Sequence, residues 1–204
     1  PDYSQSLLII TLWMIMVFVS GISFLSISMI AGSIVLLMIS ILFFFRDKFF
    51  YIFDRISSWI GQVEISYQSE QALNAIKSGG FFGRGIGEGI LKEKVPEAHT
   101  DYVMSVIAEE YGIIIVLLII SLTIFLAIRI FSLANTTKND FFRLSLIGIS
   151  SLLIIQSFIN LGVTINILPS TGMPFPFISY GGSSIMGSCI ALGVALLLSR
   201  KAQS

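Results

Sequence analysis

Long apolar runs alternate with short polar connections along most of the chain. Five such runs cover residues 7–20, 22–45, 113–131, 144–168 and 185–198. A helix rises about 1.5 Å per residue, so a run of about 20 residues crosses a hydrocarbon core of roughly 30 Å. The second run is long enough, the first reaches that length only when extended back to Tyr3, and the last is short. We therefore predict an all-α polytopic membrane protein with about five transmembrane helices.

Composition agrees with this pattern. Hydrophobic residues make up 55% of the 204 residues, charged residues make up 12%, and the mean hydropathy is +0.92. Soluble domains average about a quarter charged residues, so this chain is suited to lipid. The net charge is zero, which gives no reason to expect a nucleic-acid partner. The single cysteine, Cys189, excludes an internal disulfide. The chain begins at Pro1 and not at Met, so we expect a piece of a longer protein.

One long polar connection, residues 46–112, interrupts the apolar pattern. Residues 46–62 carry apolar side chains at helical spacing, which is typical of a helix in the headgroup region. An ordinary amphipathic helix packed on the rest of the connection explains the same spacing. Residues 69–77 predict a second short helix, ended by Ser78-Gly79-Gly80. A third helical stretch follows Asp101 and runs toward Gly112.

The middle of this connection concentrates ionisable side chains. Glu97 and Asp101 stand within five residues together with His99, the only histidine of the chain. One interpretation is structural: Thr100 or Asp101 caps the helix that follows, and Glu97 is solvated. The other is catalytic, with a carboxylate at a membrane surface. Spacing alone does not decide between them.

A glycine-rich stretch, Gly83 to Gly89, lies nearby. It resembles a phosphate-binding loop, but no strand precedes it and no lysine–serine pair follows, so the motif is weak. It could bring Arg84 and Lys92 near a phosphate. A turn that uses the conformational freedom of glycine is the favoured interpretation.

Two features interrupt the later apolar runs. Gln156 and Asn160 stand four residues apart on one helical face, and amides there usually hydrogen-bond a neighbouring helix. Residues 169–184 contain three prolines and three glycines, which forbid a regular helix. Irregular backbone near a membrane must be buried in protein or line a wet cavity.

The distribution of basic residues predicts an orientation. Arg129, Lys138 and Arg143 surround one short connection, and Arg200 follows two spans later, hence on the same side. The positive-inside rule makes that side cytoplasmic. The 46–112 connection and residues 169–184 then share the outer face.

Several motifs follow the pattern of one known family. They are Tyr67-Gln68, Gln71-Ala72-Leu73, Ser78-Gly79-Gly80, Gly83-x-Gly85-x-Gly87, Pro96-Glu97-Ala98-His99-Thr100-Asp101-Tyr102, Glu109-Glu110-x-Gly112 and Pro174-x-Pro176-x-Ile178-Ser179-Tyr180-Gly181-Gly182-Ser183-Ser184. On these residues the chain resembles the SEDS family, FtsW/RodA/SpoVE. Members have about ten spans, so the resemblance implies that residues 1–204 form the C-terminal half, a single membrane domain. Ala98 before His99 is more similar to the division branch, FtsW, than to the elongation branch.

The resemblance implies a peptidoglycan glycosyltransferase that polymerises lipid II, which is linked to undecaprenyl pyrophosphate, during septal cell-wall synthesis in cell division. The implied location is the bacterial cytoplasmic membrane, with the active face outside, and the implied partners are a class B penicillin-binding protein and other division proteins. Asp101 is the implied catalytic residue. The implied substrate-binding residues are Arg84, Lys92, Glu97, His99, Thr100, Ser179, Tyr180, Gly181, Gly182 and Ser183.

The chemistry fits a lone carboxylate. Forming a β-1,4 bond from an α-linked donor inverts the anomeric carbon, which needs one general base and no enzymic nucleophile. The charge of the leaving pyrophosphate must be met by Arg84, Lys92 or Lys94, or by a divalent cation such as Mg or Mn. His99 is favoured as a hydrogen-bonding scaffold over a metal ligand, and the ligand set stays open.

Two other functions stay open. A flippase or transporter for the same lipid would need polar residues deep in the membrane, where only Gln156 and Asn160 are found. A membrane scaffold for division proteins would leave the polar connection without a purpose.

Overall fold

The computed structural model describes residues 3–44, 67–90 and 98–203. Within these ranges the chain is all-α and contains no strand, as predicted. The helices are α1 (Tyr3–Val19), α2 (Phe24–Phe44), α4 (Tyr67–Gly79), α5 (Val103–Tyr111), α6 (Ile113–Thr136), α7 (Asp140–Thr164) and α8 (Gly182–Gln203). The helix predicted over residues 46–62 lies outside the described residues.

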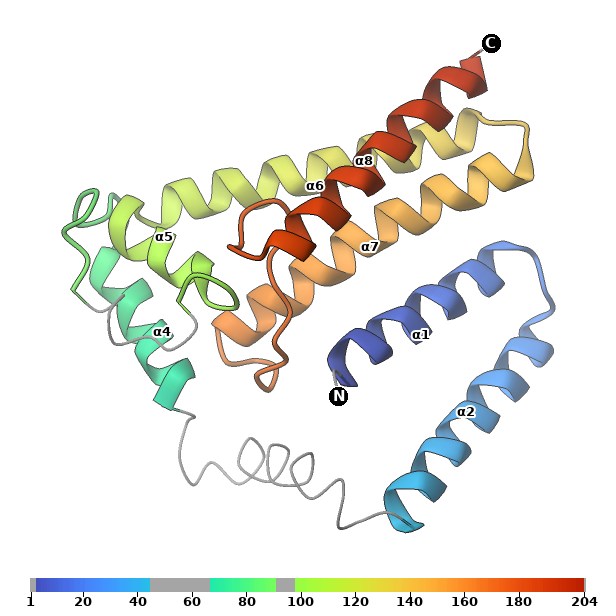
Figure 1. Cartoon of the computed structure of the whole chain (residues 1–204), viewed down its shortest axis with the longest axis horizontal. Helices are drawn as coiled ribbons and strands as arrows, with labels where there is room; N and C mark the ends of the chain where they lie inside the picture. Colours follow the sequence, from blue (N-terminus) through green and yellow to red (C-terminus); the bar gives the residue numbers. More distant parts are fainter. Residues whose placement is uncertain (1–2, 45–66, 91–97, 204) are drawn as a thin grey trace.

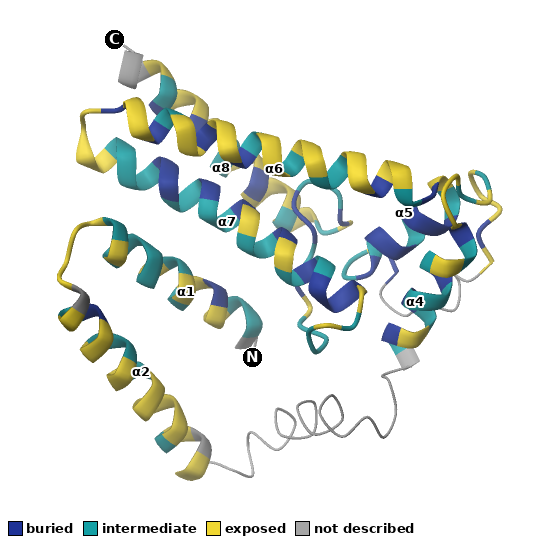
Figure 2. Ribbon diagram, turned by 180° about the vertical axis from the view of Figure 1, so that it is seen from behind, coloured by how far each residue is buried: buried dark blue, intermediate teal, exposed yellow. Residues whose placement is uncertain are grey.

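The five apolar helices correspond to the five apolar runs. Within the described residues, α6, α7 and α8 are long and apolar enough to cross a membrane. The apolar parts of α1 and α2 are shorter, over Ser4–Val19 and Leu25–Ile41. Exposed positions, yellow in Figure 2, run along these helices. Large apolar residues such as Leu36, Phe43 and Phe125 are among the exposed ones. Such a surface is suited to lipid, which solvates apolar side chains as well as a protein core does.

Several helix ends differ from the ends of the apolar runs, and backbone contacts fix the end of α7. Helix α7 stops at Thr164, four residues before the end of the apolar run, and Asn166 takes a positive φ of 58°. The N–H groups of Ile167 and Leu168 both donate back to the carbonyl of Gly162, at 2.8 and 3.0 Å. Helix α8 begins three residues earlier than its run, at Gly182.

Helices α6 and α7 form the centre of the bundle, and α8 packs against both. Their shared core contains Ala127, Ala134, Leu146 and Ala195. Small residues let the helix backbones approach closely, which is how membrane helices associate without a hydrophobic driving force. The Ser150 hydroxyl donates to the Ala127 carbonyl across the α6–α7 contact, at 2.9 Å. Helix α1 packs on α7, and α2 packs on α1.

The polar segments gather at one end of this bundle. Figure 1 places the N-termini of α1, α6 and α8 and the C-terminus of α7 at the end where α4 and α5 lie. The α1–α2 connection, the α6–α7 connection and the end of α8 lie at the opposite end. The orientation was predicted from Arg129, Lys138, Arg143 and Arg200. They belong to the α6–α7 connection, to the parts of α6 and α7 beside it, and to the end of α8. The arrangement therefore agrees with the prediction that the polar loops share one face.

Helices α4 and α5 pack on each other beside the end of α7. Ala72 and Ala75 of α4 are fully buried, in a cluster with Tyr102 and Val163. The predicted helix over residues 69–77 is confirmed, with two further residues at each end. Helix α5 confirms the helical stretch predicted after Asp101.

Candidate active site

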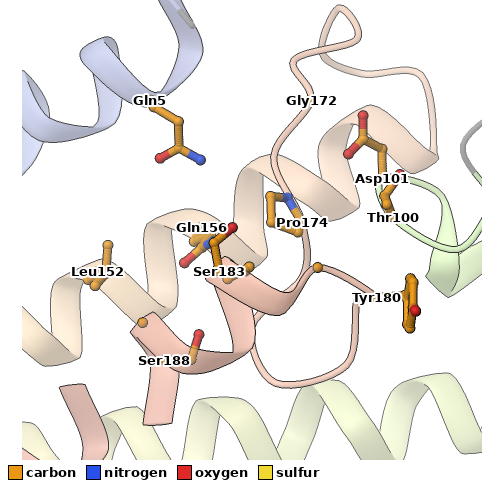
Figure 3. A pocket seen from close by; sticks show the side chains of 13 residues that line it. Gln5, Thr100, Asp101, Leu152, Gln156, Gly172, Pro174, Tyr180, Ser183 and Ser188 are labelled. Atoms are coloured by element: carbon orange, nitrogen blue, oxygen red, sulfur yellow. The ribbon is translucent and has the colours of Figure 1, made fainter. Parts of the chain in front are cut away.

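A cavity of about 620 Å³ opens at the polar end of the bundle (Figure 3). It lies between α1, α7, the first turns of α8, and two irregular segments. We call these segments the 98–102 turn and the 165–181 segment. Its volume is within the range of small-molecule sites, roughly 300–1,000 Å³. Its polar lining includes Gln5, Thr100, Asp101, Gln156, Ser183 and Ser188.

Asp101 is the one charged residue among the described residues that line this cavity. The side chain is half-buried, and Figure 3 shows its carboxylate turned toward the chain at Gly172. A Cβ atom placed on Gly172 would lie 3.8 Å from Asp101 Oδ2. Gly172 has a positive φ of 73°, a conformation in which glycine is not strained.

Neither Thr100 nor Asp101 occupies the capping position that the structural interpretation gave them. Helix α5 begins at Val103, and its N-cap residue is Tyr102, which makes no side-chain cap hydrogen bond. Tyr102 has another task. Its side chain is 1% exposed, and its hydroxyl lies 3.3 Å from Ser69 Oγ on α4. The residue after Asp101 therefore anchors the turn on α4.

Hydrogen bonds to three successive carbonyl groups also hold the 98–102 turn. The carbonyl of His99 accepts a hydrogen bond from the Tyr180 N–H at 2.8 Å. The carbonyl of Thr100 accepts from Ser179 Oγ at 2.6 Å. The carbonyl of Asp101 accepts from Asn160 Nδ2 at 2.8 Å. The turn is thus held by α7 and the 165–181 segment through its backbone.

Part of the 165–181 segment is buried, which is one of the two places where irregular backbone is tolerated in a membrane protein. Met173, Phe175 and Ser179 are at most 2% exposed. The Phe175 N–H donates to Ser179 Oγ at 2.7 Å, so this one hydroxyl serves both segments. The prediction for residues 169–184 is confirmed, because part of the segment is buried and Gly172, Pro174 and Tyr180 line the cavity.

The prediction for Asn160 was wrong in its partner. Its amide bonds no neighbouring helix. Nδ2 donates to the Met173 carbonyl at 2.7 Å as well as to the Asp101 carbonyl. The carbonyls of irregular segments need partners more than helical carbonyls do, and Asn160 supplies them. Gln156, one turn earlier on α7, lines the cavity.

The other residues implied by the resemblance fall into three groups. Thr100, Tyr180, Gly181 and Ser183 line the cavity with Asp101. Ser179 and the backbone of His99 hold the turn, while the His99 side chain is exposed and Gly182 begins α8. Arg84 is not among the cavity residues, and Lys92 and Glu97 lie outside the described residues. The role of each in substrate binding stays a prediction.

The glycine loop, residues 80–90, is packed on the end of α5. The N–H groups of Arg84 and Gly85 donate to the carbonyls of Glu109 and Glu110, at 2.9 and 3.0 Å. These amides are therefore used within the protein. Arg84 Nε donates to the Ser78 carbonyl at 3.3 Å, and the side chain is exposed. The contacts support the turn interpretation of this loop over a phosphate-binding one.

The buried side chain of Glu109 also holds the glycine loop on α5. Its side chain is 0% exposed, and Oε1 accepts a hydrogen bond from the Ile90 N–H at 3.0 Å. Glu109 lies beneath the glycine loop, where the loop backbone replaces water.

The cavity contains polar residues that motif reasoning missed. Gln5, Gln156 and Ser188 line it from three different helices. A polar residue within an apolar helix is a signal for a functional cavity, and that signal was available for Gln156 and Ser188. Gln5 precedes the first apolar run and gives no such signal.

A divalent cation held by protein ligands alone finds no donor set in the described part of the chain. No group of three His, Cys, Asp or Glu side chains gathers there. Asp101 lines the cavity, the His99 side chain is exposed, and Glu97 lies outside the described residues.

The family model described as cell cycle protein, FTSW_RODA_SPOVE, matches residues 1–204. The chain belongs to the FtsW/RodA/SpoVE family. Family membership and the apolar helices make it a multi-pass membrane protein.

Family relatives named probable peptidoglycan glycosyltransferase FtsW share substantial identity with it. The Bacillus subtilis protein is 50% identical over 121 residues, which are 59% of this chain and 30% of that protein. The Dichelobacter nodosus protein is 35% identical over 198 residues, which are 95% of this chain and 50% of that protein. The chain spans about half the length of the curated relatives that it matches along its whole length.

Two solved structures have similar folds. One, described as showing structural coordination of polymerization and crosslinking by a peptidoglycan synthase complex, aligns with a TM-score of 0.69 and 28% identity. That alignment covers 99% of this chain and 56% of the other. The second is an aspartate-to-alanine mutant of the rod shape determining protein RodA of Thermus thermophilus. Its TM-score is 0.51 at 37% identity, over 65% of this chain and 40% of that one.

Proposed function

We propose that this chain carries the catalytic part of a peptidoglycan glycosyltransferase of the FtsW type, with Asp101 as general base. One observation carries the proposal: the carboxylate of Asp101 is the single charged group on the described wall of the cavity, and its backbone is fastened from two sides. Relatives that bear the glycosyltransferase name support the reaction class.

The reaction needs one displacement. The Asp101 carboxylate accepts the proton of the acceptor sugar's 4-hydroxyl while that oxygen attacks the anomeric carbon of the donor. The new C–O bond forms as the bond from the anomeric carbon to the pyrophosphate oxygen breaks, and the configuration inverts. Lipid II is the proposed donor. A carboxylate on a fixed turn loses little freedom when the acceptor arrives, and correct placement is itself a large part of catalysis.

The leaving pyrophosphate requires positive charge, and no described cavity residue supplies it. We assign that task to Lys92 and Lys94, which stand a few residues before the turn in the sequence, and to Arg84 on the glycine loop, which packs on the end of α5. A divalent cation bound jointly by a carboxylate and the pyrophosphate is the other source. Loss of polymerisation on chelation, restored by Mg²⁺ or Mn²⁺, would favour the cation. Unchanged activity would leave the charge to the basic side chains.

The cavity end of the bundle is the proposed extracytoplasmic face of a bacterial cytoplasmic membrane. The basic residues near the opposite end support this orientation through the positive-inside rule. A class B penicillin-binding protein is the proposed partner, to cross-link the strands that the family member polymerises. The similarity to a protein from a peptidoglycan synthase complex supports a synthase partner.

The decisive experiment compares two carboxylate-to-amide variants. Each is made in a full-length protein in which this chain forms the C-terminal half, purified with its transpeptidase partner and given lipid II. Asp101→Asn removes the base without changing the size of the side chain, and we expect polymerisation to fall at least about 100-fold. Asp140→Asn makes the same change at the exposed start of α7, where Asp140 pairs with Arg143 at 3.2 Å. It should polymerise normally. Glycan chains of normal yield from Asp101→Asn would overturn the assignment.

One observation favours the transporter alternative. The cavity reaches from the 98–102 turn past Gln156 to Ser188, between α7 and α8, so its wall is not confined to the surface loops. Translocation of lipid II across vesicles separates the two functions. A transporter would move lipid II without lengthening glycan, whereas the proposed enzyme lengthens glycan when lipid II is supplied on the cavity side alone.

A further inference from the structure

We propose that Asn160 is a positioning residue, which fixes the Asp101 carboxylate in the cavity through backbone hydrogen bonds and does not contact substrate. The inference rests on the proposed function, because it concerns the same carboxylate. It assigns a task to a buried amide that neither the motifs nor the proposed chemistry uses.

The geometry begins with a single nitrogen atom. Asn160 lies on α7 and is 1% exposed. Its Nδ2 donates to the Asp101 carbonyl at 2.8 Å and to the Met173 carbonyl at 2.7 Å. A primary amide has two N–H donors at a fixed angle, and both are used here. Asn160 therefore sets the distance between the 98–102 turn and the 165–181 segment.

Both acceptors lie next to the reactive group. The Asp101 carbonyl and the Asp101 side chain leave the same Cα atom, so holding the carbonyl limits where the carboxylate can go. Met173 follows Gly172, the residue whose backbone faces Asp101 Oδ2. Ser179 and Tyr180 hold the carbonyls of Thr100 and His99, one and two residues away. Of these three contacts, only that of Asn160 holds both the carboxylate-bearing residue and the backbone wall beside it.

The orientation of the amide supports its role as a donor. Rotating the amide by 180° would turn Oδ1 toward two carbonyl oxygens, which is repulsive, so Nδ2 must face them. Oδ1 is buried and has no hydrogen-bond partner within the described part of the chain. Leaving a buried acceptor unpaired is unfavourable. The two N–H groups therefore explain why an amide stands at this position, although its Oδ1 gains no hydrogen bond there.

The test uses the full-length protein with its partner, as for the Asp101 variants. Asn160→Leu keeps approximate size and removes both donors. We expect kcat for lipid II polymerisation to fall about 10- to 100-fold, with KM changed less than about twofold, because a displaced base slows the proton transfer more than it weakens binding. The matched control is Ser157→Ala. Ser157 is also buried on α7, but its hydroxyl bonds only the Leu153 carbonyl of its own helix, and its activity should stay within about twofold.

A pH profile separates positioning from loss of folded protein. Partial misfolding scales kcat/KM at every pH by the same factor. Displacing the carboxylate changes its surroundings, so the midpoint of the rising limb should move by about half a pH unit or more in Asn160→Leu and not in Ser157→Ala. If Asn160→Leu fails to reach the membrane, Asn160→Ser, which keeps one donor, carries the same measurement and should fall between wild type and a full loss.

The outcomes are distinct for the two proposals. If wild type and Asp101→Asn polymerise alike, the proposed function fails. If Asp101→Asn is inactive while folded Asn160→Leu matches Ser157→Ala in rate, the positioning role alone is wrong. A lower rate of Asn160→Leu with an unchanged pH midpoint would likewise show that Asn160 supports the fold and does not position Asp101.

Discussion

Asp101 has a fixed place at the cavity because other elements hold its two neighbours in sequence. Tyr102 is buried against α4, and the Thr100 carbonyl is bound by Ser179 on the opposite side. Between two fixed residues, the intervening side chain has few places to go. As the proposed general base, Asp101 would therefore need little reorganisation when the acceptor arrives.

Two serines, four residues apart, should separate support of the turn from contact with substrate. In Ser179→Ala, the Phe175 N–H and the Thr100 carbonyl lose a buried partner, which should reduce the free energy of unfolding by about 1–3 kcal/mol. In Ser183→Ala, an exposed hydroxyl on the cavity wall is removed, so stability should change by less than about 0.5 kcal/mol.

Thermal unfolding of the two purified variants, together with KM for lipid II, checks this prediction. Ser183→Ala should raise KM without changing the melting temperature, and Ser179→Ala should lower the melting temperature. Equal melting temperatures would mean that the Ser179 contacts do not hold the turn.

For single residues, the sequence predicts which side chains come together at the cavity. It does not predict the hydrogen bonds that hold them in place. The resemblance named Asp101, Tyr180 and Ser183, and all three line one cavity. The task of Asn160 was not predictable, because it depends on which carbonyls the fold leaves unpaired near α7. The capping interpretation of Asp101 failed for a related reason: the helix start is set by the burial of Tyr102 and not by a cap.

Among the elements, the glycine loop is fixed by close backbone contact with the α5–α6 junction. A Cβ atom on Gly112 would lie 2.2 Å from the Phe81 carbonyl oxygen, and one on Gly83 would lie 2.2 Å from the Glu110 carbonyl oxygen. The loop and the α5–α6 junction therefore approach one another to a distance that a side chain forbids. Phe81 and Phe82 on this loop are 72% and 85% exposed, so the loop is held by its backbone and not by its aromatic rings.

Two glycines with the same positive φ should differ in what alanine does to them. Gly112 and Gly87 both have a φ of 84°, so alanine is strained at either position by about 1–3 kcal/mol. Gly87 has no atom within 4 Å of an added Cβ, whereas Gly112 has the Phe81 backbone at 2.2 Å. We expect Gly112→Ala to destabilise by on the order of 3 kcal/mol more than Gly87→Ala, because the loop must leave α5.

Limited proteolysis of the purified variants measures this difference directly. Cleavage within residues 80–90 should become faster in Gly112→Ala and stay close to wild type in Gly87→Ala. Similar cleavage of both variants would show that strain, and not the close contact, governs the loop.

The apolar runs predict which membrane helices form, because about 20 consecutive apolar residues are typical of a transmembrane helix. Helix ends follow less well. The end of α7 is set by backbone hydrogen bonds to Gly162 and by Leu168, which packs on that glycine, so it depends on tertiary contact. The glycine motif identified a turn correctly, but periodicity contains no information about the α5 carbonyls that it meets.

For the whole molecule, the most important fact is how much of its relatives' length this chain covers. The chain spans about half of its curated relatives, and α2 exposes apolar residues such as Leu25, Leu36 and Phe43 over most of its surface. Lipid solvates such side chains, but Gln5 and Gln156 face a cavity that α1, α7 and α8 enclose only in part. A polar group left facing lipid is unfavourable by about 0.6–2 kcal/mol.

We therefore expect the 204-residue chain to insert into membranes and to polymerise no lipid II by itself. Activity should return when it is co-expressed with the other half of a full-length relative, such as the N-terminal half of the Bacillus subtilis protein. Glycan synthesis in detergent, with each half alone as control, measures this. Robust polymerisation by the isolated chain would show that its cavity is already complete.

The contacts of the 98–102 turn also bear on the order in which the site is made. Thr100 is held by a hydroxyl that is 79 residues further along the chain, and Asp101 by an amide 59 residues further along. A ribosome makes the carboxylate long before it makes the groups that hold it. Until α7 and Ser179 have been made, the turn is held only by the contact of Tyr102 with α4. Chains released before that point would carry the Asp101 carboxylate without its supports from α7 and the 165–181 segment.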